Sequence, residues 1–314
     1  MLKRYLCFSL IILVLISTIF FLKQFTSESY TENRTKPNSQ VTSWGYDLLK
    51  SDIYLNDSDK IKVAIIDSGI NKNHEDLKYL RFKEYNVLEK NIPITDEFGH
   101  GTSIAGIIAA NDNNFGVRGL TNNIEIFDVK ILNEEGKGEI ENLIEGIEWC
   151  IDQNVEIINL SFGFQTENEQ LKEVINKAVE EDIIIVASIG NTFGMQGNYP
   201  AKYDEVISIT SISESLKRSN FASRNNIDFA MPGEDIYTTN NEGGYSMVDG
   251  TSFATAHATG VISNLLLLYR QEEQTISFKE YLELFSYKEQ GWNYIDYGNG
   301  ILKQEKRIDN EKIK

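Results

Sequence analysis

Hydrophobic residues recur along the body of the chain in short runs that are separated by amphipathic stretches. Five runs are rich in Ile and Val, and we expect each to form a buried strand. These runs are residues 61–66, 124–129, 155–160, 183–187 and 206–210. Apolar positions at helical spacing predict helices at residues 101–110, 139–152 and 170–181. Continuous apolar strands that alternate with helices indicate an α/β fold in three layers, a mostly parallel β-sheet with helices on both faces.

A further apolar stretch runs to about residue 270 and directly follows Gly250-Thr251-Ser252. Its length and hydrophobicity predict a buried helix, so the Ser252 hydroxyl would lie at a helix N-terminus. Backbone N–H groups and the helix macrodipole favour negative charge there. Taken alone, a serine at this place is most often an N-cap. A nucleophilic serine also needs a base and an acid, which must come from elsewhere in the chain.

An uncharged apolar run precedes the body. Lys3 and Arg4 come before residues 5–22, and Lys23 closes the run. Such a segment is a signal peptide or an N-terminal membrane anchor, and its length is at the lower limit of about 18 residues for a bilayer span. No A-x-A cleavage site follows, which favours a retained anchor. The basic residues in front predict that the N-terminus lies inside and the body outside.

The chain therefore divides into three expected parts. Residues 1–23 are the signal peptide or anchor, residues 24–39 are a polar and flexible linker, and residues 40–314 are one folded domain. We expect an extracytoplasmic protein, either held at the membrane by its N-terminal segment or secreted. The linker is too short to be a folded pro-domain, so we expect folding without one or with help from another protein.

Composition limits the possible partners. The formal net charge of -17 argues against nucleic acid or an anionic membrane surface as the main partner. The two cysteines, Cys7 and Cys150, form neither a disulfide framework nor a metal-binding spacing. We expect a monomer.

The chain contains three histidines from which a base for Ser252 can be chosen. His257 is five residues past Ser252 on the same predicted helix, so it points about 140° away and is expected to be a packed helix residue. His74 lies in a polar loop and is expected to be structural or exposed. His100 stands between two glycines at the start of a predicted helix, which makes it the natural base. Asp67, directly after the first strand, would orient it, although an Asp after a strand is also a common turn residue.

Three motifs surround these residues in the order Asp, His, Ser. They are residues 63–70 (VAIIDSGI), 99–106 (GHGTSIAG) and 250–257 (GTSFATAH). With these motifs the chain closely resembles the subtilisin-like serine proteases, the subtilase family, and the order is the one that subtilisin itself displays. The resemblance covers roughly residues 40 to 305. It implies a subtilisin-like fold and a serine endopeptidase with the triad Asp67, His100 and Ser252, which acts through an acyl-enzyme intermediate on extended polypeptide substrates.

Further residues take their expected roles from this resemblance. Asn191 matches the asparagine that donates to the oxyanion, together with the backbone N–H of Ser252. The residues that match the substrate-binding segments are Ser161, Phe162, Gly163, Ala187, Ser188, Gly190 and Asn198. Two positions depart from the family pattern, because Ala256 replaces a usual proline and Phe164 a usual small residue. The first removes no catalytic group, and the second leaves the shape of the specificity pocket open.

The resemblance also implies a structural Ca²⁺ site. Its ligands would be Gln40, Asp76, Asn111, Asn113, Phe115 and Val117, the last two and Asn111 through backbone carbonyls. Hard oxygen ligands of mixed carboxylate and carbonyl type suit Ca²⁺. By composition alone, the segment from Asn111 to Val117 is better explained as a polar turn, and only the resemblance favours a calcium site.

Two biological roles remain open at this point. One is broad degradation of extracytoplasmic protein. The other is processing of a secreted precursor, as in dedicated maturation proteases such as lantibiotic leader peptidases, which the anchor and the missing pro-domain favour. The alternative from another class is a catalytically inactive subtilase fold that binds extended peptides. It would require a broken triad or oxyanion group, whereas all four residues are present.

Overall fold

The computed structural model describes residues 31–34, 37, 39–50, 60–272 and 274–305. The predicted signal peptide or anchor, residues 1–23, lies outside the described residues, as does most of the predicted linker. Within the part that is described, no helix combines the length and the hydropathy that a bilayer span requires.

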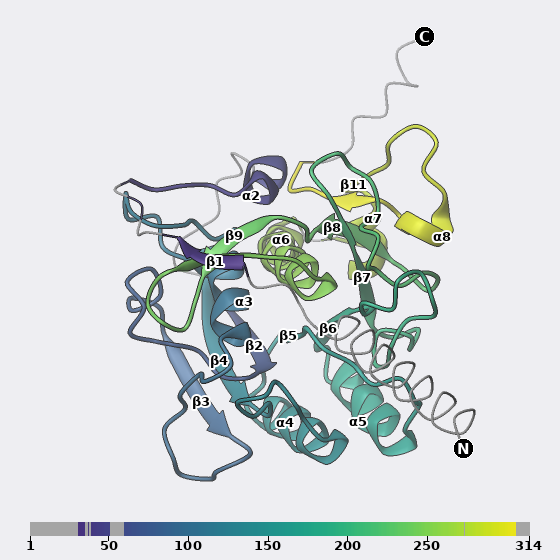
Figure 1. Ribbon diagram of the computed structural model, residues 1–314. Coiled ribbons are helices and arrows are strands. Elements are labelled where there is room, and N and C mark those ends of the chain that lie inside the picture. The colour runs from purple at the N-terminus through teal and green to yellow at the C-terminus, as the bar shows by residue number, and fades with distance from the viewer. Residues whose placement is uncertain (1–30, 35–36, 38, 51–59, 273, 306–314) are drawn as a thin grey trace, which may run out of the picture.

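A seven-stranded sheet forms the centre of the described structure (Figure 1). Its strands are all parallel and lie in the order β3-β4-β2-β5-β6-β7-β8. Their bounds are β2 (Ile61–Asp67), β3 (Phe82–Asn86), β4 (Ile124–Lys130), β5 (Ile157–Leu160), β6 (Ile184–Ser188), β7 (Ile207–Ile212) and β8 (Phe229–Pro232). The five predicted runs correspond to β2, β4, β5, β6 and β7, with ends within two residues of the prediction.

Two strands of this sheet were not predicted. β3 is an edge strand whose side chains are mostly exposed or half-buried, so its sequence carries charges instead of an apolar run. β8 has only four residues and ends in Pro232. β3 thus lacks the continuous apolar pattern on which the prediction depended, whereas β8 is apolar and buried but too short to be recognised as a strand.

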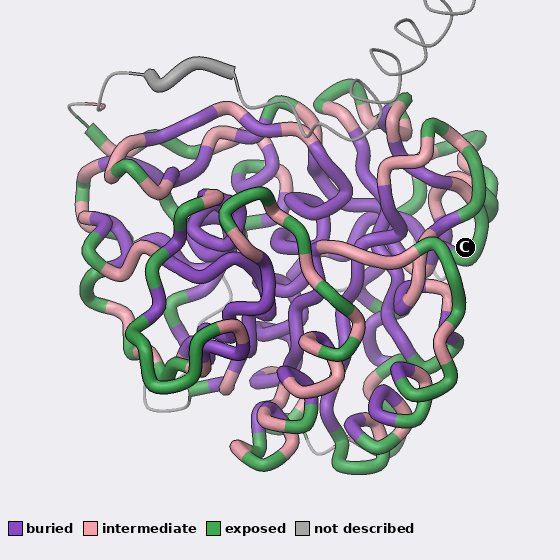
Figure 2. The backbone as a smooth tube through the Cα atoms, turned by 60° about the horizontal axis from the view of Figure 1, so that its bottom comes forward, coloured by how far each residue is buried: buried purple, intermediate pink, exposed green. Residues whose placement is uncertain are grey.

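Helices cover both faces of the sheet, which confirms the predicted three layers (Figure 1). α3 (His100–Ala109) and α6 (Thr251–Gln271) pack in one hydrophobic cluster with one face of the sheet. α4 (Ile140–Asp152) and α5 (Glu169–Glu180) pack in a second cluster on the other face. Each of the predicted helices agrees with the structure to within about one residue. The buried backbone runs through the middle of the molecule, and exposed residues lie on the outer loops (Figure 2).

The remaining elements lie around this core. They are α2 (Trp44–Leu49), β9 (Ile236–Thr239), β10 (Tyr245–Val248), α7 (Phe278–Glu283), β11 (Ser286–Tyr287), α8 (Tyr294–Tyr297) and β12 (Ile301–Leu302). β9 and β10 form an antiparallel hairpin. A third strand, β1 (Thr31–Arg34), pairs antiparallel with β10. Four residues within the predicted linker, residues 31–34, thus pair through their backbone with the edge of β10, a contact that the local sequence does not reveal.

Parallel strands place their carboxyl ends at one edge of the sheet. Asp67 ends β2, Ser188 ends β6, and Ser161 directly follows β5. Side chains from segments far apart in the sequence therefore meet at this edge, where α/β folds commonly carry their chemistry.

Candidate active site

The end of β2 and the start of α3 bring an acid and a histidine into contact. His100 Nδ1 lies 2.8 Å from both Asp67 Oδ1 and Asp67 Oδ2. Both side chains are buried, and the backbone N–H of Ser68 donates to Asp67 Oδ1 at 2.7 Å. A carboxylate that accepts from Nδ1 orients the ring and leaves Nε2 as the nitrogen that can take up a proton. Gly99 precedes the helix with φ 93°, a left-handed conformation that favours glycine.

A network of polar side chains fixes the turn that carries His100. Asp96 accepts hydrogen bonds from Ser68 Oγ at 2.8 Å, Gly99 N at 2.7 Å, and both the N–H and the hydroxyl of Thr102. Burial raises the pKa of Asp96, and these hydrogen bonds oppose that shift. Lys130 Nζ donates to Ser68 O at 2.7 Å. This network could not be predicted from the sequence, because its members belong to different elements and have no periodic spacing.

Ser252 lies in the first turn of α6, and it is not the N-cap. Gly250 is the N-cap and contributes no side chain, so Ser252 is not a capping residue. The Ser252 hydroxyl donates to the Ser161 carbonyl at 2.6 Å. The ring of the next residue, Phe253, has its centroid 5.5 Å from that of His100. The first turn of α6 therefore lies beside His100.

Thr251 holds the amide of Asn191 in one orientation. Asn191 Oδ1 accepts from Thr251 N at 3.1 Å and from Thr251 Oγ1 at 2.9 Å. Because the amide oxygen is engaged in this way, the Nδ2 hydrogens are the part of the group that is directed elsewhere and available to a ligand. The hydrogen bonds from Thr251 to Asn191 were not predicted. The position of Thr251 next to Ser252 was the only feature of the sequence that could have indicated them.

The predicted substrate-binding residues lie in two neighbouring strand ends and one loop. Ser161 Oγ donates to Asn159 Oδ1 at 2.8 Å, and Ala187 and Ser188 are buried at the end of β6. Asn198 lies close to two of the predicted glycines. A Cβ atom added at Gly163 would lie 2.9 Å from Asn198 Cβ, and one added at Gly190 would lie 2.7 Å from Asn198 Nδ2.

The residue next to Asn198 ties this loop to the segment after β5. Phe164 and Tyr199 exchange two backbone hydrogen bonds, at 2.7 and 2.8 Å. Phe164 also packs against Phe162, another predicted binding residue. The structure thus brings the predicted residues of all three segments to one place.

The other two histidines are packed in the core, as expected for His257 and for the structural interpretation of His74. His257 is buried on α6, and burial lowers its pKa to about 4, so it is neutral near pH 7. His74 is buried as well, and its Nε2 lies 2.9 Å from Gly244 O. Neither is in position to serve Ser252, which leaves His100 as the candidate base.

The six predicted calcium ligands also meet in space. Asp76 Oδ1 accepts from Asn113 Nδ2 at 2.9 Å, and Asp76 Oδ2 accepts from Val117 N at 2.9 Å. Gln40 Nε2 donates to the carbonyl oxygens of Asn111 at 2.9 Å and Val117 at 3.4 Å. Asn113 Oδ1 accepts from Phe115 N at 3.0 Å, which curls the loop around the carboxylate.

This arrangement fits Ca²⁺ in the chemistry of its donors. A half-turn of the Gln40 amide presents its oxygen beside the two carbonyls that its nitrogen now contacts, and oxygens that converge in this way are what Ca²⁺ requires. Within the described residues, no group of three or more His, Cys, Asp or Glu is arranged to hold a metal. The predicted set contains only one carboxylate, Asp76, so it depends on amide and carbonyl oxygens.

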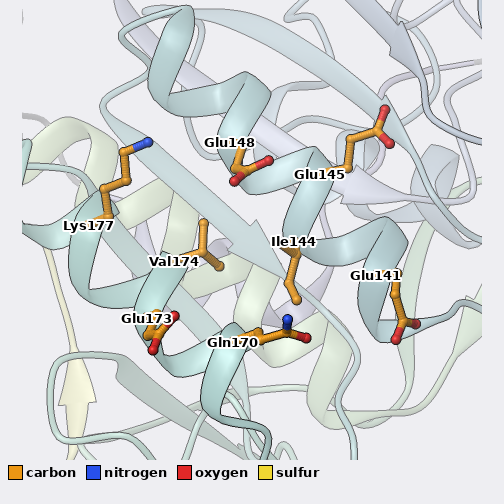
Figure 3. A pocket seen from close by; sticks show the side chains of 8 residues that line it. All are labelled: Glu141, Ile144, Glu145, Glu148, Gln170, Glu173, Val174 and Lys177. Atoms are coloured by element: carbon orange, nitrogen blue, oxygen red, sulfur yellow. The ribbon is translucent and has the colours of Figure 1, made fainter.

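A groove of about 490 Å³ lies between α4 and α5, away from all these residues (Figure 3). Glu141, Glu145 and Glu148 project from α4, and Glu173 and Lys177 project from α5. The groove contains none of the predicted catalytic residues. It accounts for part of the negative charge of the molecule.

Comparison with known proteins agrees with this geometry. The family model described as the subtilase family (Peptidase_S8) matches residues 58–281. Subtilisin DY from Bacillus licheniformis is 34% identical over 246 residues, which cover 74% of this chain and 86% of that protein. Subtilisin E from Bacillus subtilis (strain 168) is 38% identical over 212 residues, 66% of this chain and 55% of that protein.

A relative that is named as an intracellular enzyme is similar to a comparable degree. The major intracellular serine protease of Bacillus subtilis (strain 168) is 36% identical over 223 residues, 68% of this chain and 70% of that protein. The chain spans only about half the length of subtilisin E, so the extent of similarity differs among these relatives.

Proposed function

The chain belongs to the subtilase family of serine endopeptidases, and from this premise we propose that Asp67, His100 and Ser252 are its catalytic triad. The observation that supports the proposal most directly is the contact of His100 Nδ1 with the buried Asp67 carboxylate at 2.8 Å. A histidine that is buried and bound in this way serves as a general base in acyl transfer. The proposed substrate is a polypeptide in extended conformation.

In the proposed mechanism, Ser252 Oγ attacks the carbonyl carbon of the scissile bond and gives its proton to His100 Nε2. Asp67 stabilises the imidazolium that forms. The C–N bond then breaks, the proton passes from His100 to the leaving amine, and an acyl-enzyme remains. Water attacks this ester with His100 again as the base, which releases the acid product and restores the Ser252 hydroxyl.

Asn191 and the backbone N–H of Ser252 are proposed to stabilise the oxyanion. The two hydrogen bonds from Thr251 support this role, because they fix the amide before substrate binds. Preorganised donors avoid reorganisation during the reaction, and removal of one such donor in subtilisin costs on the order of 10²–10³ in kcat.

The experiment that tests the triad is labelling of the full chain with a fluorophosphonate probe, together with an assay of peptide-bond hydrolysis. Ser252→Ala should abolish labelling and lower kcat by on the order of 10⁶, the loss measured when subtilisin loses its nucleophile. Ser263→Ala is the matched control, because Ser263 is a buried serine of the same helix whose hydroxyl bonds to Thr259 O. Undiminished hydrolysis by Ser252→Ala would overturn the assignment. A folded wild type that neither labels nor hydrolyses would favour the alternative, an inactive fold that binds extended peptides.

We also propose that Gln40, Asp76 and Asn113, with the carbonyls of Asn111, Phe115 and Val117, hold a structural Ca²⁺. The ion would tie the segment before α2 to the loop after α3 and so stabilise the fold around the site. Two sets of contacts support this proposal: Asn113 and Val117 bind Asp76, and Gln40 binds the carbonyl oxygens of Asn111 and Val117.

The proposed location and substrate are supported by the amino-acid sequence alone. The apolar run at residues 5–22 supports an extracytoplasmic enzyme, anchored or secreted, that processes a secreted precursor or degrades extracytoplasmic protein. Digestion of a random peptide library separates these roles, since many unrelated cleavage sites indicate degradation and few indicate a dedicated substrate.

A further inference from the structure

Exposed apolar side chains gather in one region of the described structure. Nine large hydrophobic residues are exposed in the described part of the chain, and four of them belong to two short segments. They are Phe193, Met195, Tyr294 and Ile295, which we call the apolar patch. Met195 is 62% exposed and Ile295 is 53% exposed. Exposed apolar residues that cluster on neighbouring segments mark an interaction site more often than scattered single residues do.

The two segments are held side by side through a third. Arg224 N donates to Met195 O at 3.0 Å, and Asn225 N donates to Ile295 O at 3.2 Å. Arg224 also pairs with Asp296, through Nε at 2.6 Å and Nη2 at 2.9 Å. The backbone positions that carry Met195 and Ile295 are therefore fixed on either side of residues 224 and 225. A surface that is preorganised in this way binds with little loss of conformational entropy.

The patch is continuous with the proposed oxyanion site. Asn191 is directly followed by the loop that carries Phe193 and Met195, and four residues of chain span at most about 14 Å. Ser223 ties the start of this loop to the pocket segment, since its hydroxyl donates to Gly190 O at 2.7 Å and lies 2.8 Å from Thr192 Oγ1. A polypeptide bound at Ser252 can therefore reach the patch with residues a few positions from the scissile bond.

We propose that the apolar patch is a secondary binding site for the polypeptide substrate, which takes apolar or aromatic side chains outside the residues that flank the cleaved bond. The inference rests on the proposed peptidase function and adds a preference to it. Substrates long enough to cover both sites would bind more tightly than short ones. Because the patch contacts no reacting atom, it would change KM and leave kcat unaltered.

The test compares two substrates on the full chain. One is casein, an unfolded polypeptide, and the other is a short chromogenic peptide chosen from a tetrapeptide library for turnover by the wild type. The double variant Met195→Ser/Ile295→Ser should lower kcat/KM for casein about tenfold, mainly through KM, and leave the short peptide unchanged. Met195→Leu/Ile295→Leu should restore the wild-type value for casein. The matched control Tyr79→Ser/Ile92→Ser changes two comparably exposed residues elsewhere and should alter neither substrate.

Each outcome decides the proposal. Equal casein kinetics for the serine double variant and the wild type would overturn it, and so would an equal loss on both substrates, which would indicate a structural effect on the active site. A wild type that hydrolyses neither substrate would contradict the proposed function itself, which is a different result from a wild type whose hydrolysis ignores the patch.

Discussion

Asp96 and Asp128 are two buried carboxyl groups near β2, and they differ in how far hydrogen bonds offset the cost of burying their charge. Asp96 accepts hydrogen bonds from Ser68, Gly99 and Thr102. Asp128, on β4, is fully buried, and burial raises its pKa to about 8 against the opposing charge of Lys72. Asp96 and Lys130 are the other charged groups that act on it. Asp128 is therefore neutral in the folded protein at pH 7, and its ionisation would oppose folding.

Asp128→Asn should stabilise the protein, and more so at alkaline pH. The pKa of Asp128 is raised from 3.8 in the unfolded chain to about 8 in the folded one. Between these values the folded state keeps a proton that the unfolded state loses. Below about pH 4 both states are protonated and Asp128 does not lower the free energy of unfolding. Between about pH 4 and pH 8 it lowers this free energy by about 1.4 kcal/mol per pH unit, and above pH 8 the loss levels off. Thermal melts at pH 5 and pH 8 should show a larger gain in Tm for the variant at pH 8.

The matched control for this titration is Asp204→Asn, which changes an exposed aspartate. It should leave the pH dependence of Tm unaltered. An equal Tm difference between Asp128→Asn and wild type at both pH values would contradict the assigned titration.

At the scale of elements, α3 and the β9–β10 hairpin are packed without space between them. All ten residues of α3 are buried. Thr238 Oγ1 donates to Ser103 O at 2.9 Å, and Thr239 Oγ1 donates to Thr102 O at 2.7 Å. A Cβ atom at Gly106 would lie 2.2 Å from Thr239 Oγ1 and 2.6 Å from Thr238 Oγ1. The close approach of helix and hairpin therefore requires glycine here, and it holds the turn that begins with His100.

Gly106→Ala should destabilise the protein by about 1–3 kcal/mol, the usual cost of overpacking a buried contact. The methyl group displaces both threonine hydroxyls from the first turns of α3, so catalytic activity should fall as well. Urea unfolding with a parallel hydrolysis assay measures both effects. Gly244→Ala is the control, since a Cβ atom there would lie 3.6 Å from the nearest atoms, those of the Asn240 side chain, which is an ordinary contact. Wild-type stability in Gly106→Ala would show that the helix can shift at little cost.

At the scale of the whole molecule, the net charge of -17 opposes the compact state through self-repulsion. A bound cation would offset part of this repulsion. The proposed calcium site joins Gln40, which precedes α2, to the loop between α3 and β4. The backbone bond from Val41 N to Gly116 O, at 2.7 Å, connects the same two segments. The ion would therefore link parts of the chain that are more than seventy residues apart.

Millimolar Ca²⁺ should raise the Tm of the wild type, because a ligand that binds only the folded state stabilises it by mass action. Asp76→Asn should abolish most of this Ca²⁺-dependent rise, whatever its effect on Tm without the ion. Asp112→Asn, in the same loop, is the control, because Asp112 pairs with Arg118 and is not a predicted ligand. An unchanged rise in Asp76→Asn, or no rise in the wild type, would contradict the site.

Much of the fold could be predicted from local pattern. The strands β2, β4, β5, β6 and β7 lie in the interior of the sheet, where burial on both faces demands continuous apolar runs. The helices α3, α4, α5 and α6 were predicted for a similar reason, since each has a distinct apolar face or is buried throughout. β3 was not predicted, because an edge strand with exposed side chains obeys no such demand, and β8 was not predicted, because its apolar run has only four residues.

The sequence by itself determined the family, the order of the three motifs and the identity of the candidate residues, because each motif is a contiguous stretch of chain. Only the tertiary structure decided how they cooperate. It excluded Ser252 as an N-cap, joined Thr251 to Asn191, surrounded Asp96 with donors and paired residues 31–34 with β10. Contacts of this kind join segments that are distant along the chain. Their partners are chosen by strand order and helix packing, which no local pattern of polar and apolar residues encodes.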